Sequence, residues 1–88
     1  MEPKLNTRKY ALINLYNQML QELVGNEFNL SLLQKKESFS TVLDLNLATN
    51  ININKDTIQK IRSSLTILLQ MIAEQEKADE LYKKEEQN

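Results

Sequence analysis

Histidine, cysteine and tryptophan are absent from this 88-residue chain, and glycine and proline occur once each. Without histidine, the chain lacks the commonest general base near neutral pH and the commonest metal ligand. Without cysteine, it can form neither a disulfide nor a thiolate metal site. A glycine-rich phosphate loop needs several glycines, so a single glycine excludes that motif. We therefore predict that the protein is not an enzyme and holds no cofactor or metal.

An excess of one charge is also missing, because 11 basic residues face 12 acidic ones and the net charge is −1. Proteins that bind a nucleic-acid backbone need a concentrated basic face. A helix-turn-helix reader could use Lys55, Gln59, Lys60 and Arg62 as its recognition surface, but Asp56 lies among them. We therefore predict no nucleic-acid partner.

Long hydrophobic runs are missing as well. The longest charge-free run at helical spacing in the second half of the chain, residues 63–73, has eleven residues. A membrane-spanning helix needs about 20. The N-terminal residues are polar and show no secretory signal. These features favour a cytoplasmic protein without a transmembrane segment.

The feature that is present is helical periodicity, and it is clearest in residues 54–73. Apolar residues recur there at alternating spacings of three and four, which is the period of one helix face: Ile58, Ile61, Leu65, Leu68 and Ile72. Asn54 is a good N-cap, and Asp56 places a negative charge in the first turn. The pattern predicts a long last helix that begins at Asn54 and continues to about residue 84.

A first helix is predicted over residues 7–24, ending at Gly25-Asn26, where a left-handed residue would stop it. The weaker pattern that follows fits two short helices, over 29–36 and 38–48 with Ser38 as a cap, or one bent helix. Residues 49–54 then form an extended connector. The expected fold is all-α, a small antiparallel three- or four-helix bundle in a single domain (1–88), with 1–6 as a frayed lead-in. Its predicted core contains Leu12, Tyr16, Leu20, Leu43, Ile61, Leu65 and Leu68.

The C-terminal segment, residues 74–88, is charged and has few apolar residues. Glu76, Asp79 and Glu80 share a helical face, but no oxygen-rich loop accompanies them, so we interpret them as a solvated helix end and not as a cation site. This segment would project, fray, or pack on a partner. A homodimer through the C-terminal helix is one such arrangement.

The order of these predicted segments resembles that of the immunity proteins for pediocin-like (class IIa) bacteriocins. The closest stretch is SFSTVLDLNLATNININKDTIQKIRSSLTILL, residues 38–69, which is similar in layout to the third helix, connector and fourth helix of that family. The resemblance implies a cytosolic four-helix bundle from a Gram-positive bacterium that protects the producer cell. It also implies that the C-terminal half, residues 55–82 here, recognises bacteriocin bound to its membrane receptor.

With no catalytic motif, the function has to come from binding a protein. Exposed arginine and aromatic side chains commonly anchor protein interfaces, so we predict Arg62 and Tyr82 as partner-binding residues. Two functions fit: bacteriocin immunity, or a small helical adaptor, inhibitor or complex subunit encoded by a phage or plasmid.

Overall fold

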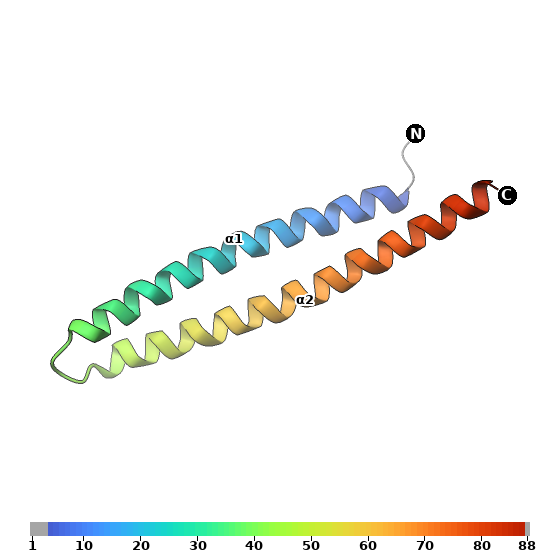
Figure 1. Cartoon of the computed structure of the whole chain (residues 1–88). Helices are drawn as coiled ribbons and strands as arrows, with labels where there is room; N and C mark the ends of the chain where they lie inside the picture. The colour runs from blue at the N-terminus through green and yellow to red at the C-terminus, as the bar shows by residue number, and fades with distance from the viewer. Residues whose placement is uncertain (1–3, 88) are drawn as a thin grey trace.

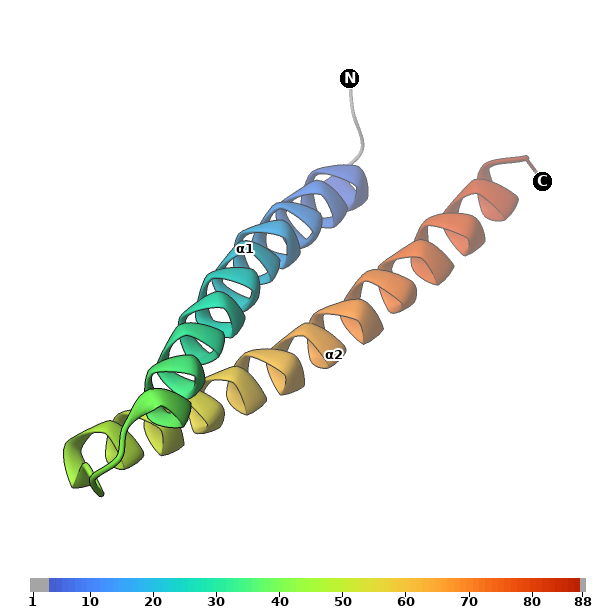
Figure 2. The ribbon, with the colours of Figure 1, turned by 60° about the vertical axis from the view of Figure 1, so that its left-hand side comes forward.

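Two long helices make up the fold of residues 4–87, the part of the chain that the computed structural model describes. Helix α1 spans Lys4–Phe39 and helix α2 spans Leu45–Gln87. They run antiparallel, joined by a turn, so that the start of α1 and the end of α2 lie at the same end of the hairpin (Figure 1). The Cα atoms extend over 71 × 19 × 14 Å. In a view turned by 60°, the ribbons lie closer together at the turn than at the terminal end (Figure 2).

The two helices meet along a seam with a seven-residue repeat. Every third or fourth residue of α2 is buried or half-buried, namely Leu47, Ile51, Asn54, Ile58, Ile61, Leu65, Leu68, Ile72, Gln75 and Asp79. The matching positions of α1 are Lys9, Leu12, Tyr16, Met19, Leu23, Asn26, Leu30 and Leu33. Alternating spacings of three and four are the pattern of a left-handed coiled coil. The hairpin is therefore an antiparallel two-helix coiled coil.

The all-α prediction is confirmed for residues 4–87, but the predicted three- or four-helix bundle is wrong, because these residues form two helices. The single turn spans residues 40–44, where Asp44 caps α2 by accepting a hydrogen bond from the backbone N–H of Leu47 at 3.1 Å. Ser38 lies in the last turn of α1, and its hydroxyl donates to the carbonyl of Lys35. The predicted boundary at Ser38 is thus close to a real helix end, but a helix stops there instead of starting.

Gly25 does not end a helix, contrary to the sequence-based prediction. Its φ is not positive, and α1 continues through it to Phe39. A mid-helix glycine costs about 1 kcal/mol relative to alanine. That cost is small beside the packing of α1 against α2, which extends on both sides of Gly25.

The connector predicted over residues 49–54 is also absent, because these residues are helical and belong to α2. Ile51 is buried in the seam while Ile53 is exposed, so the alternation that resembles a strand places the two isoleucines on different sides of a helix. The last helix consequently begins nine residues before Asn54. At the other end, Lys4 already belongs to α1, within the predicted 1–6 lead-in, and residues 1–3 lie outside the described residues.

The predicted core is partly correct. Leu12, Ile61, Leu65 and Leu68 are buried in the seam, together with Leu47, Ile51 and Ile58. Tyr16 is half-buried. Leu20 is 39% exposed and Leu43, in the turn, is 80% exposed, so neither belongs to the core of the hairpin. A two-helix seam is narrower than the interior of a bundle, and it cannot cover these two side chains.

Two asparagines, Asn26 and Asn54, form a polar layer within the seam, and exposed Asn29 lies beside it. Asn54 is buried, and its side-chain amide donates to the backbone carbonyl of Asn26 at 3.1 Å. The amide of Asn29 donates in turn to the side-chain oxygen of Asn54 at 2.6 Å. Asn26 and Asn54, predicted to mark a helix end and a helix start, thus face each other from the middle of two helices. A buried asparagine in a coiled coil fixes the register of the helices at a cost in stability.

We expect that Gly25→Ala stabilises the protein by about 0.5–1 kcal/mol, because alanine loses less conformational entropy on entering a helix. A Cβ atom added at Gly25 meets no atom within 4 Å, so no clash opposes this gain. Urea unfolding followed by circular dichroism measures the change. A loss of stability would instead indicate that the chain stops its first helix at Gly25 in a left-handed conformation.

Candidate interaction surface

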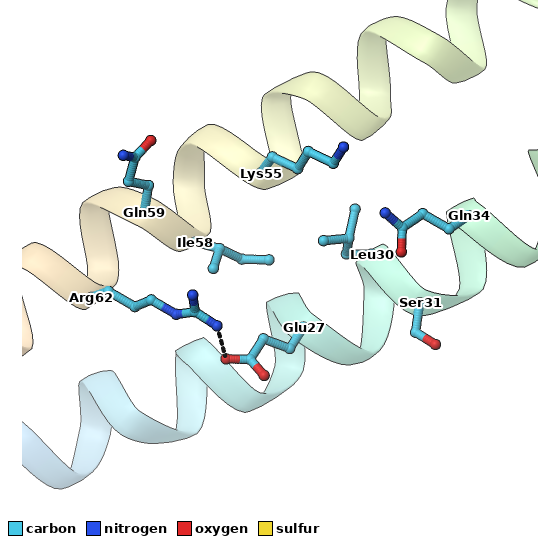
Figure 3. A pocket seen from close by; sticks show the side chains of 8 residues that line it. All are labelled: Glu27, Leu30, Ser31, Gln34, Lys55, Ile58, Gln59 and Arg62. Carbon is cyan, nitrogen blue, oxygen red and sulfur yellow. Dashed lines mark hydrogen bonds and ion pairs between the residues drawn. The ribbon is translucent and has the colours of Figure 1, made fainter.

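The seam divides the exposed surface of the hairpin into two sides, and a groove runs along each. Glu27 and Ser31 of α1 line one groove with Lys55, Gln59 and Arg62 of α2. Figure 3 shows this groove, with Leu30 and Ile58 between the ribbons. The opposite groove is lined by a different set of residues, which are Asn26, Asn29, Leu33, Asn50, Ile53, Asn54 and Thr57.

An ion pair crosses the first groove. The guanidinium of Arg62 donates to a carboxylate oxygen of Glu27 at 3.2 Å (Figure 3). Nearer the termini, the ammonium of Lys9 lies 3.3 Å from a carboxylate oxygen of Glu76. Such exposed pairs contribute little to stability. They do show how the helices are aligned, because residues 9–27 of α1 lie beside residues 62–76 of α2.

The seven-residue repeat extends the first side of the hairpin toward the termini. Residues seven positions apart lie on the same side of a coiled-coil helix. Glu27 is therefore aligned with Leu20 and Ile13, Ser31 with Val24, Asn17 and Tyr10, and Arg62 with Leu69. The groove is lined mainly by polar residues, whereas these aligned positions nearer the termini are mostly apolar. We call the five apolar residues at these positions the open face: Tyr10, Ile13, Leu20, Val24 and Leu69.

Charge is nearly absent around the open face. Residues 10–34 contain two charged side chains, Glu22 and Glu27, and residues 63–73 contain none. The two ion pairs place these uncharged stretches side by side over residues 63–73. Cores of protein interfaces are depleted of charge and enriched in large apolar side chains. The open face therefore has the composition of an interface. The lack of charge in residues 10–34 can be seen in the sequence. Which of these residues lie on the open face becomes clear only from the way in which the two helices pair.

The two predicted partner-binding residues do not form one site. Arg62 and Tyr82 are both exposed on α2, but twenty residues of helix separate them, which is about 30 Å. Arg62 lies at the edge of the open face and is paired with Glu27. Tyr82 lies near the C-terminal end of the helix, beyond the open face. A single small contact cannot include both residues.

Two of the three carboxylates that share a face near the end of α2, Glu76 and Asp79, interact with other side chains. Glu76 pairs with Lys9, and Asp79 accepts a hydrogen bond from the buried side-chain amide of Gln75 at 3.3 Å. Within the described residues, no group of three or more histidine, cysteine, aspartate or glutamate side chains could hold a metal ion.

Neither helix, over the residues described, contains a stretch long and apolar enough to cross a membrane. Comparison with known proteins yields no match to a family model, to a curated protein or to a solved structure.

Proposed function

We propose that this protein acts without catalysis, by binding a protein through the apolar side of its helical hairpin. One observation carries the proposal: the open face combines large apolar side chains, exposed except for the half-buried Ile13, with surroundings that contain almost no charge. Among the side chains described, fifteen large hydrophobic residues are exposed, and four of them belong to the open face: Tyr10, Leu20, Val24 and Leu69. Exposed apolar surface of this kind is typical of protein interaction sites.

The proposal is tested by affinity capture from the cells that produce the protein, with two matched variants. Leu20→Glu/Val24→Glu places two charges on the open face, and Ile53→Glu places one charge on the opposite groove, where Ile53 is also exposed. A protein retained by the wild type and by Ile53→Glu, and lost from the double variant, supports the proposal. Capture that is equal for all three chains, at equal helical content, contradicts it.

Bacteriocin immunity is the more specific function that the resemblance implies, and it stays a prediction. The resemblance depended on a third helix, a connector and a fourth helix within residues 38–69, whereas 45–69 are part of one continuous helix. For this reason we propose the general binding function first. If the chain is an immunity protein, its expression in a sensitive strain confers resistance to one cognate peptide, and Arg62→Ala or Tyr82→Ala reduces it. Resistance to none of a panel of such peptides would leave the adaptor or subunit function.

A further inference from the structure

We infer that the protein covering the open face is a second copy of this chain, so that two hairpins form a four-helix bundle. This inference rests on the proposed function, because it names the partner of the same surface. It differs from a dimer through the charged C-terminal helix end, which lies largely outside the open face.

The exposed area of the hairpin supports a large interface. The chain exposes 7217 Å². A compact monomer of 10.3 kDa exposes about 5,400 Å². The excess, about 1,800 Å² per chain or about 3,600 Å² for two, falls in the range of obligate homodimer interfaces, roughly 2,000–5,000 Å². The Cα radius of gyration of 20.0 Å, against about 12 Å for a compact chain of this length, shows the same departure from a closed fold.

The interior of the single hairpin is also incomplete. No large side chain in the described part of the chain is fully buried. A two-helix coiled coil needs only a narrow apolar stripe, whereas a helix in a bundle shows a wider one. Ile13 and Leu20 widen the stripe of α1 on the side of the open face, and Leu69 does so on α2. A four-helix bundle uses stripes of this width.

Because it carries no charge, the open face can pack against the same face of a second copy. In a symmetric dimer the same patch is present on both subunits, so like charges within it would repel. The five open-face residues carry no charge, and Glu27 beside them is paired with Arg62. The single hairpin has a thin interior and needs a partner that is always available. A second copy of the chain is present wherever the chain is made.

The test is the mass of the protein in solution, measured by analytical ultracentrifugation from about 1 to 200 µM, a range that spans the micromolar dissociation constants of weak complexes. We expect the wild type and Ile53→Glu to be dimers of twice 10.3 kDa. We expect Leu20→Glu/Val24→Glu to raise the dissociation constant at least about 100-fold, because buried like charges oppose association. Circular dichroism checks that the variant stays helical. If it unfolds, Leu69→Gln, on the other helix, replaces it and is expected to weaken the dimer.

Three results would overturn the inference. A wild-type chain that is monomeric at 200 µM has no second copy on its open face, although the capture experiment still tests whether another protein binds there. Open-face variants that stay as tightly dimeric as the wild type would place the dimer interface elsewhere. A truncation after Ala73 that alone abolishes the dimer would assign the interface to the C-terminal helix end.

Discussion

Leu65→Ala is expected to lower the free energy of unfolding by about 2–5 kcal/mol, as the truncation of a buried leucine does. Leu65 is 6% exposed and lies in the middle of the seam, with Ile61 and Leu68 on the same face of α2. A core of this size supplies only about 3–5 kcal/mol in total. The variant should therefore be largely unfolded at 25 °C. Urea or thermal unfolding followed by circular dichroism, at one fixed protein concentration, measures the loss.

Leu81→Ala is the matched control for this prediction. Leu81 is on the same helix but is 62% exposed, outside both the seam and the open face. Its truncation should change the stability by less than about 0.5 kcal/mol, which is the range of ordinary surface substitutions. Equal losses for the two leucines would mean that the buried side of α2 is assigned wrongly.

Asn54→Ala is expected to destabilise the hairpin by about 0.5–1.5 kcal/mol, because it removes hydrogen bonds that cross the seam. The groups that lose a bond are the backbone carbonyl of Asn26 and the exposed side-chain amide of Asn29. Asn52→Ala is the control, since Asn52 is exposed on the same helix two residues away. Urea unfolding should show a clearly larger loss of stability for Asn54→Ala than for Asn52→Ala. Equal losses would contradict a stabilising role of the polar layer.

The double variant Asn26→Leu/Asn54→Leu is expected to stabilise the hairpin, in contrast to Asn54→Ala. The side-chain amide of Asn54 also donates to the side-chain oxygen of Asn26, at 3.4 Å. Replacing both partners of such a contact by apolar side chains is commonly neutral or stabilising. The melting temperature should rise, while the register of the two helices becomes less well defined. Spin labels at Glu27→Cys and Arg62→Cys, in a chain that has no other cysteine, report the register as a distance distribution. A distribution as narrow as that of the parent chain would show that the asparagines do not set the register.

Several features of this protein follow from its sequence alone. The spacing of Ile58, Ile61, Leu65 and Leu68 determines both the helix and the face that it buries, because a period of three and four residues fits no other regular structure. Exposed Arg62 was also predictable, since it lies off that face. The absence of histidine and cysteine restricts the available chemistry whatever the fold.

The number and length of the helices were decided only by the tertiary structure. Glycine and asparagine commonly end or begin helices. Local sequence preferences therefore predict helix boundaries at Gly25, Asn26 and Asn54. Their intrinsic preferences are worth about 1 kcal/mol each. Pairing along the whole seam outweighs that amount, and it converts the two asparagines into hydrogen-bond partners 28 residues apart in the sequence. The open face is likewise a property of the pairing, because Leu69 and Leu20 share one side of the molecule only when α2 lies against α1.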